Sequence, residues 1–220
     1  MRRKFWLIAI ALSALAIQGC TERVLVPPRI DLKQHEVVGI IEFDCSGKGE
    51  LAPFLTHRFV DAIRVDQDLV RIVRLGTSAE VLADIGRPQL DRDAFKEIGQ
   101  KHQVKTVFTG NLAVSEVKPS VAIGHSLTHF GVSADVDATL NAQMVETETG
   151  ASLWSRSARA VERIGGIEVF GDKNFTFDAD DPENAYGRLA DTLVAAVTHD
   201  FRCRWIRVKK EVDTGSHLEL

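Results

Sequence analysis

Large apolar residues recur at steps of three and four positions near the end of the chain, at Tyr186, Leu189, Leu193, Val197, Phe201 and Trp205. Because an α-helix has 3.6 residues per turn, this spacing places all of these side chains on one side of a helix. Asp181 and Pro182 precede the run and suit an N-cap and a first helical position. The pattern therefore predicts one long amphipathic helix that begins at Pro182 and packs on a sheet.

Residues 36–44 predict a strand buried on both faces, since they are β-branched and mostly apolar. Two further strands are expected at 68–75 and 104–114. Helical spacing predicts helices at 51–64 and 91–102, and the capping-box spacing of Thr77 and Glu80 predicts a helix at 77–85. Alternating apolar residues around a "TETG" turn predict a hairpin at 136–160. The resulting order predicts an α/β (α+β) fold in which helices flank a mixed sheet.

The beginning of the chain has the pattern of an exported bacterial lipoprotein. Basic residues at 2–4 precede an apolar run at 5–17, which suits a secretory signal and is too short for a comfortable transmembrane helix. The run leads into "IQGC", which resembles a lipobox and predicts cleavage before Cys20, whose thiol then receives a covalent lipid that includes palmitate. Thr21, rather than an aspartate, follows and predicts sorting to the outer membrane, facing the periplasm. An ordinary cleaved signal peptide and an uncleaved anchor are the alternatives.

The charge of the mature chain argues against nucleic acid as a partner. Removal of residues 1–19 leaves 24 basic and 31 acidic residues, a net charge near −7. Nucleic-acid binding would call for a basic stripe, which the sequence lacks. The chain divides into a signal peptide (1–19), a lipidated tether with a Pro-Pro kink (20–36), a single periplasmic domain (37–206) and a polar tail (207–220).

Two cysteines remain besides Cys20. The periplasm is oxidising, so Cys45 and Cys203 are candidates for a disulfide, and two separate buried thiols are the alternative. No local motif gives either of them a histidine or acidic partner, and GxSxG, HExxH and CxxC are absent from the sequence. We therefore expect a protein that is not an enzyme and that has no cofactor beyond the lipid on Cys20.

Residues 119–134, "PSVAIGHSLTHFGVSA", contain no formally charged side chain. A membrane-crossing strand, a metal site on His125 and His129, and ordinary sheet and loop are three interpretations. In a strand, the two histidines share a face but lie about 13 Å apart. One zinc ion would need both nitrogens within about 2.1 Å, so we predict no metal site here.

The chain resembles the curli-secretion lipoprotein (CsgG) family, LpoB, and the N-terminal domain of TolB. The resemblance covers residues 37–160 and rests on the order of "VVGIIEFD", a helix, "LVRIVRL", "AFKEIGQKHQVKTVFTGNL" and "LNAQMVETETGASLWSRSA". Its most specific part is the stretch 145–155, a strand, a Thr-Gly turn and a returning Leu-Trp-Ser. The resemblance implies a non-enzymatic envelope protein with an anticodon-binding-like fold.

In the pore-forming member of this family, two segments leave the periplasmic domain as membrane hairpins. The corresponding segments here are β-insertions at 115–135 and 158–181. The first alternates apolar with small residues, whereas charges in the second fall on both faces of a strand, which disfavours insertion into lipid. The candidates for assembly or membrane contacts in these insertions are Val121, Ile123, Leu127, Phe130, Val132, Ile167, Val169 and Phe170.

The resemblance implies two roles for an outer-membrane-anchored protein. In the first, the chain acts in envelope assembly or secretion through contacts with itself or with other envelope proteins. In the alternative, it is an LpoB-like regulatory module that binds a peptidoglycan synthase or another envelope enzyme. The short tether at 20–36 argues against a long reach across the periplasm, and the two insertions favour the first role.

Overall fold

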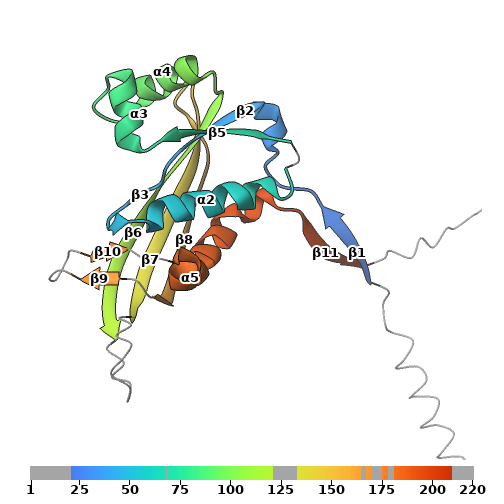
Figure 1. Ribbon diagram of the computed structural model, residues 1–220. Helices are drawn as coiled ribbons and strands as arrows, with labels where there is room; N and C mark the ends of the chain where they lie inside the picture. Colours follow the sequence, from blue (N-terminus) through green and yellow to red (C-terminus); the bar gives the residue numbers. More distant parts are fainter. Residues whose placement is uncertain are drawn as a thin grey trace, which may run out of the picture. The chain divides into compact units, whose positions relative to one another are not determined.

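The structure is a computed structural model that describes residues 21–67, 69–120, 133–164, 167–169, 175–177 and 181–209 (Figure 1). These residues belong to two units. The smaller unit contains residues 21–27 and 203–209, and the larger one contains the described residues from 28 to 202.

The larger unit contains helices on both faces of a sheet. Its helices are η1 (Leu32–His35), α2 (Leu51–Arg64), α3 (Ser78–Ile85), α4 (Arg92–His102), α5 (Pro182–Val197) and η2 (Thr198–Phe201), of which η1 and η2 are 3-10 turns. Its strands are β2 (Val37–Ile41), β3 (Asp44–Cys45), β4 (Lys48–Gly49), β5 (Arg71–Gly76), β6 (Thr106–Ser120), β7 (Ser133–Glu146), β8 (Ser152–Ile164), β9 (Ile167–Val169) and β10 (Phe175–Phe177). The predicted mixed α/β class is confirmed.

The main sheet has the strand order β5-β2-β6-β7-β8, and β3 pairs with β6 beside this path. Strand β2 runs parallel to β5 and β6, whereas β6, β7 and β8 are antiparallel neighbours. The predicted "TETG" hairpin is confirmed, because β7 and β8 pair and Gly150 has the positive φ of 68° that its turn requires. A second, small sheet has the order β4-β10-β9. Strands β6, β7 and β8 continue into the segments expected as insertions.

Two hydrophobic cores lie on opposite faces of the sheet. Strand β2 contributes to both, because Ile40 packs in the core under α2 and α5 whereas Ile41 packs in the core under α3 and α4. Burial on both faces is what the β-branched composition of this strand predicted. The side chains around this strand pack closely, since a Cβ atom at Gly39 would lie 2.9 Å from Leu75 Cδ1 on the neighbouring strand β5.

Aromatic rings form the centre of the first core. The rings of Phe43 and Phe59 lie 5.0 Å apart, those of Phe59 and Phe108 5.2 Å, and those of Phe108 and Phe201 5.6 Å, all edge to face. Phe201 also contacts Trp154 at 4.8 Å. These rings come from α2, β6, β8 and η2 and the turn after β2, so they join the helices to the sheet.

The long C-terminal helix is confirmed, but the prediction that it reaches Trp205 is wrong. Helix α5 ends at Val197, and the Thr198 hydroxyl donates a hydrogen bond back to the carbonyl of Val194 at 2.7 Å. The chain then tightens into η2, which places Phe201 in the aromatic core. Trp205 therefore lies beyond the helix, in a strand.

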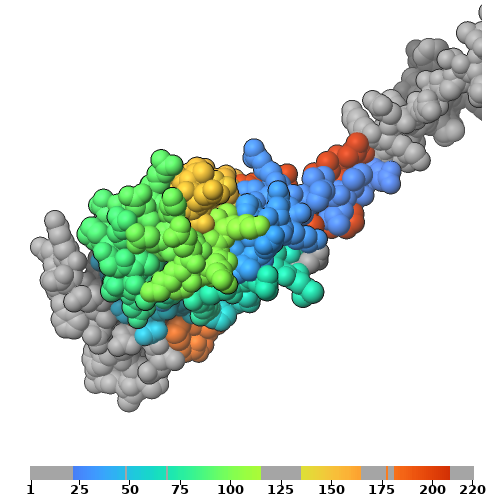
Figure 2. All heavy atoms as spheres, turned by 90° about the horizontal axis from the view of Figure 1, so that it is seen from above, coloured from blue at the N-terminus to red at the C-terminus, as the bar shows by residue number. Residues whose placement is uncertain are grey.

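The smaller unit is an antiparallel ribbon of β1 (Thr21–Val26) and β11 (Arg204–Lys209), in which Leu25 pairs with Trp205. Figure 2 shows the blue atoms of β1 beside the red atoms of β11. Residues 21–26 were expected in a tether, and 207–209 in a polar tail. Their strand pairing was not predicted, because each of the two segments is short and has no partner nearby in the sequence.

Candidate functional site

Most of the predicted contact residues fall outside the part of the chain that the structure describes. These are Val121, Ile123, Leu127, Phe130, Val132 and Phe170, together with the lipidation candidate Cys20 and the histidines His125 and His129. Ile167 and Val169 lie in β9, which pairs with β10. The lipidation of Cys20 and the assembly or membrane contacts of the predicted contact residues stay predictions.

The two cysteines considered for a disulfide belong to different units. Cys45 is half-buried in the larger unit, and its sulfur accepts a hydrogen bond from the Gly47 N–H at 3.4 Å. Burial raises the pKa of the Cys45 thiol, so the neutral form is favoured. Cys203 belongs to the smaller unit. A bridge between them would join the two units, and it stays a prediction.

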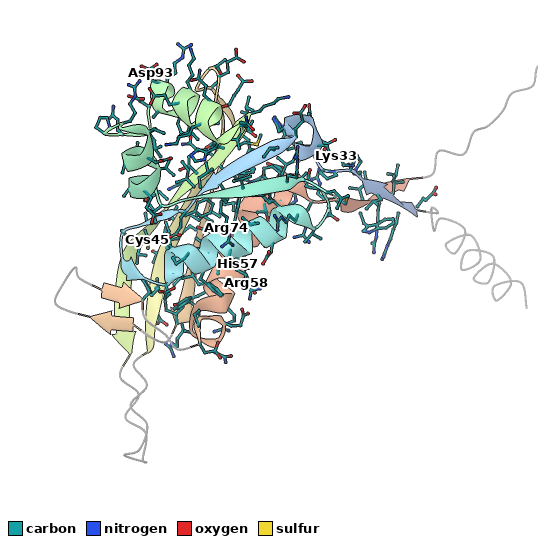
Figure 3. The ribbon with its side chains drawn as sticks, turned by 45° about the horizontal axis from the view of Figure 1, so that its top comes forward. Lys33, Cys45, His57, Arg58, Arg74 and Asp93 are labelled. Atoms are coloured by element: carbon teal, nitrogen blue, oxygen red, sulfur yellow. The ribbon has the colours of Figure 1, made fainter. Side chains whose placement is uncertain are left out.

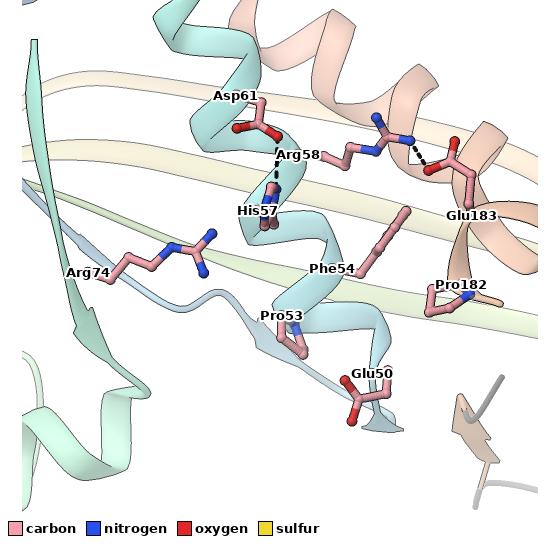
Figure 4. Close-up of a pocket in the computed structure, with 9 residues that line it drawn as sticks. All are labelled: Glu50, Pro53, Phe54, His57, Arg58, Asp61, Arg74, Pro182 and Glu183. Carbon is pink, nitrogen blue, oxygen red and sulfur yellow. Dashed lines mark hydrogen bonds and ion pairs between the residues drawn. The ribbon is translucent and has the colours of Figure 1, made fainter. Parts of the chain in front are cut away.

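One side of helix α2 lines an open groove, which we call the α2 groove (Figure 4). Its cavity volume is about 480 Å³. The helix residues that line it follow helical spacing, while the opposite side of the helix is buried in the aromatic core. The lining residues are Glu50, Pro53, Phe54, His57, Arg58, Asp61, Arg74, Pro182 and Glu183.

Charged pairs cross and flank this groove. Arg58 forms an ion pair with Glu183 in the first turn of α5, and its guanidinium lies 5.4 Å from the centre of the Phe54 ring. His57 Nδ1 lies 2.8 Å from a carboxylate oxygen of Asp61, one helical turn further along. Glu183, His57 and Asp61 are more than half exposed, so each of these contacts stabilises the fold by less than about 1 kcal/mol.

Arg74 lies on the other side of the groove, on strand β5. Figures 3 and 4 show its side chain extending towards His57 on α2. None of the ion pairs within the described residues includes Arg74. Its positive charge does favour the ionised form of the Glu42 carboxyl group. The pKa of Glu42 is nevertheless raised above its ordinary value, because burial and the charges of Glu80 and Glu50 outweigh the charge of Arg74. Arg74 is thus a cation at the edge of the groove whose charge is available to a ligand.

Strand β5 stands at one end of the sheet order, next to β2 alone. Its outer backbone edge therefore has no strand neighbour among the described residues. An edge strand presents unpaired N–H and C=O groups on which another extended chain can pair. The strand that contributes Arg74 to the α2 groove thus also has an open backbone edge.

A second open surface covers the face of β6, β7 and β8 that no described helix buries. A polar hollow of about 320 Å³ includes Thr109, Asn111, Asn141, Gln143 and Ser155. Further along these strands, Arg159 Nε donates to Asp137 at 2.8 Å and Arg163 Nε donates to Asp135 at 2.9 Å. These cross-strand pairs use the charges within the sheet itself, so the hollow offers amide and hydroxyl groups and the carboxylate of Asp44 to a ligand.

Neither surface contains a recognisable metal centre. Within the described residues, no group of three or more His, Cys, Asp and Glu side chains could hold a metal ion. A search of the same residues also finds no helix with the length and apolarity needed to cross a bilayer. The α2 groove was not predicted from the sequence. The signal for it was a second stripe on α2, where the half-buried Phe54 and Arg58 stand one helical turn apart beside the buried stripe.

Comparisons with known proteins concern the fold. No protein-family model and no curated protein matches the chain. Among solved structures, the PelC dodecamer from Paraburkholderia phytofirmans is similar over 84% of this chain and 99% of that chain, with 10% identity and a TM-score of 0.47. The LpoB C-terminal domain from Salmonella enterica is 12% identical over 62% of this chain and 86% of its own, with a TM-score of 0.37.

A lipoprotein from Neisseria meningitidis is 17% identical over 58% of this chain and 83% of that chain, with a TM-score of 0.35. The expected likeness to LpoB thus appears among the solved structures, whereas the likeness to the curli-secretion lipoprotein stays a prediction. With TM-scores below 0.5, none of these likenesses identifies a function for the chain.

Proposed function

We propose that this chain is a lipoprotein of the bacterial outer membrane that acts in envelope assembly or secretion by binding proteins rather than by catalysis. The lipobox-like sequence before Cys20 supports the anchor and the compartment. The α2 groove supports the mode of action, and it is the observation on which the proposal depends.

The groove fits an extended protein segment better than a small molecule. It is open and includes charged side chains from α2, β5 and α5, whereas a small-molecule site encloses most of its ligand. An extended segment that pairs with the outer edge of β5 would run beside α2. A carboxylate on that segment would pair with Arg74, and an apolar side chain would contact Phe54.

A photo-crosslinker in place of His57, in cells that make the protein, tests this mode of binding. We expect an adduct of one discrete mass, lost when Arg74 is changed to Glu. Arg71→Glu is the matched control, because Arg71 lies on the same strand but, by the alternation of side chains, on the face away from the groove. Equal adducts in wild type and Arg74→Glu, or no adduct at all, would overturn the proposal.

Two measurements test the remaining parts of the proposal. Mass spectrometry of the N-terminal peptide should find acyl chains on Cys20, and an unmodified cysteine would exclude the anchor. Light scattering of the detergent-extracted protein should give a large discrete oligomer for an assembly or secretion component. A monomer would instead favour the LpoB-like regulatory module that the sequence left as the alternative.

A further inference from the structure

The β1–β11 ribbon exposes large apolar side chains on both faces. Trp205 is 67% exposed and Leu25 49%, and the same ribbon exposes Val24, Ile206 and Val208. A two-stranded ribbon buries little apolar surface by itself and is only marginally stable in water. Exposed apolar side chains gathered on such a ribbon indicate a surface that another phase or molecule covers.

The strand register places two of these apolar side chains on the same face of the ribbon as two arginines. Directly paired residues share a face, so the pairs Leu25–Trp205 and Arg23–Arg207 lie on one face, since they are two residues apart on each strand. We call this set the Trp205 face. The opposite face carries Val24 paired with Ile206 and Val26 paired with Arg204.

An aromatic and an aliphatic side chain beside two arginines is a combination that suits the surface of a phospholipid bilayer. Tryptophan prefers the boundary between headgroups and acyl chains, because its ring is largely apolar while its N–H needs a polar partner. Arginine binds phosphate oxygens through several donors, and its apolar stem can lie along the acyl boundary. No acidic residue is present on the Trp205 face to repel phosphate.

The position of the ribbon in the chain specifies this partner further. Strand β1 begins at Thr21, the residue directly after Cys20. Consecutive Cα atoms are about 3.8 Å apart, so a lipid on Cys20 would hold the start of the ribbon within a few ångströms of the headgroups. A bilayer is therefore the first surface that the ribbon would meet.

We propose that the β1–β11 ribbon docks on the phospholipid surface beside the lipid anchor. Trp205 and Leu25 enter the boundary between headgroups and acyl chains, and Arg23 and Arg207 bind lipid phosphates. The ribbon then holds the protein at the bilayer by a second contact, which limits the rotation of the chain about its lipid. This inference rests on the proposed function for the anchor at Cys20.

The mature chain offers a direct optical test, because it contains Trp154 and Trp205 alone and Trp154 is only 8% exposed. The lipidated protein is reconstituted into vesicles of phosphatidylethanolamine and phosphatidylglycerol that contain brominated acyl chains, which quench nearby indole rings. We expect strong quenching in wild type and almost none in Trp205→Phe. Unquenched fluorescence in the wild-type protein would overturn the proposal.

The unlipidated chain that begins at Thr21 separates this inference from the anchor itself. We expect it to bind the same vesicles in a salt-sensitive way, with about fivefold weaker binding for each of Arg23→Gln and Arg207→Gln. Trp205→Ser should weaken binding by about tenfold. Arg188→Gln, an exposed arginine on α5, is the matched control and should bind as wild type does.

Two other outcomes would count against the proposal. Vesicle binding that is unchanged by all three ribbon substitutions would show that another surface meets the lipid. A blue shift of Trp205 fluorescence that grows with protein concentration in the absence of vesicles would show that a second copy covers the ribbon. An unmodified Cys20 combined with ribbon-dependent vesicle binding would refute the anchor while leaving the ribbon's role intact.

Discussion

Trp154 and Trp205 belong to the same mature chain but have opposite surroundings. Trp154 is 8% exposed and packs against Phe201 and Phe108 in the larger unit, where its Nε1 donates to Asp200 at 3.3 Å. Trp205 is 67% exposed and faces Leu25 across a two-stranded ribbon. The larger unit stacks helices on a sheet and can enclose a ring, whereas a ribbon of two strands cannot.

The difference shows that apolar residues contribute to separate properties in the two regions. In the aromatic core they contribute to the free energy of folding, because the fold itself removes them from water. In the ribbon the fold leaves the apolar side chains exposed to water, so they are buried only when the ribbon contacts a lipid surface or another molecule. Substitutions in the core should therefore change stability, and substitutions in the ribbon should change binding.

Replacement of Phe108 by Ala should have the largest effect on stability. The Phe108 ring is fully buried and contacts the rings of Phe59, Trp154 and Phe201. We expect the free energy of unfolding to fall by about 3–5 kcal/mol, as measured by urea denaturation. Val161→Ala, on the exposed side of β8, should cost less than about 0.5 kcal/mol. A loss below about 1 kcal/mol for Phe108→Ala would contradict the core described here.

Asp200→Asn should have an intermediate effect that depends on pH. Burial alone would raise the pKa of Asp200, but hydrogen bonds from Arg156 and Trp154, with the charges of Arg156 and Arg29, hold that pKa below its ordinary value. A carboxyl group with a lowered pKa stabilises the folded state above its unfolded pKa of about 4, and this stabilisation is lost as the pH falls through the lower, folded value.

We therefore expect Asp200→Asn to lower the free energy of unfolding by about 2 kcal/mol at neutral pH, because a charged acceptor is lost. The difference from wild type should shrink when urea denaturation is repeated below about pH 4. Asp191→Asn is a suitable control, since that carboxylate is 63% exposed and lies 3.8 Å from Arg58. A difference that grows on acidification would show that Arg156 does not stabilise the Asp200 carboxylate.

Trp205→Ala should have the smallest effect on folding, although the side chain removed is the largest. Because Trp205 is exposed in the ribbon, its replacement removes few contacts within the chain. We expect the free energy of unfolding of the unlipidated chain to change by less than about 0.5 kcal/mol, as measured by urea denaturation. Vesicle binding of the same variant should fall sharply. A stability loss that matches Phe108→Ala would remove the contrast between the core and the ribbon.

Much of the larger unit could be predicted from local patterns. The bounds of α2 agree with the prediction, because the buried stripe from Leu51 to Ile63 repeats at helical spacing over the whole element. Thr77 and Glu80 form the expected capping box, and Asp91 caps α4 through the N–H of Ala94. These signals involve residues within a turn of one another, so a single sequence contains them completely.

The α2 groove and the ribbon could not be predicted in the same way. Arg74 and Glu183 line the groove beside α2 only because of the tertiary fold. The sheet order places β5 on one side of α2, and the packing of α5 places its first turn on the other. Trp205 continues the four-residue steps of Val197 and Phe201, so the periodicity alone extends the helix to it. The hydrogen bond of Thr198 and the packing of Phe201 end the helix earlier.

The sequence by itself determined the class of fold, the main helices and strands of the larger unit and the pattern that predicts an exported, lipid-anchored protein. These depend on periodicity, capping and composition, which act over a few residues. Only the tertiary structure decided that residues 21–26 pair with residues 204–209, and that an edge strand and two helices line one open groove. The reason is physical: pairing between distant segments depends on which surfaces the rest of the fold leaves open, and no local pattern contains that information.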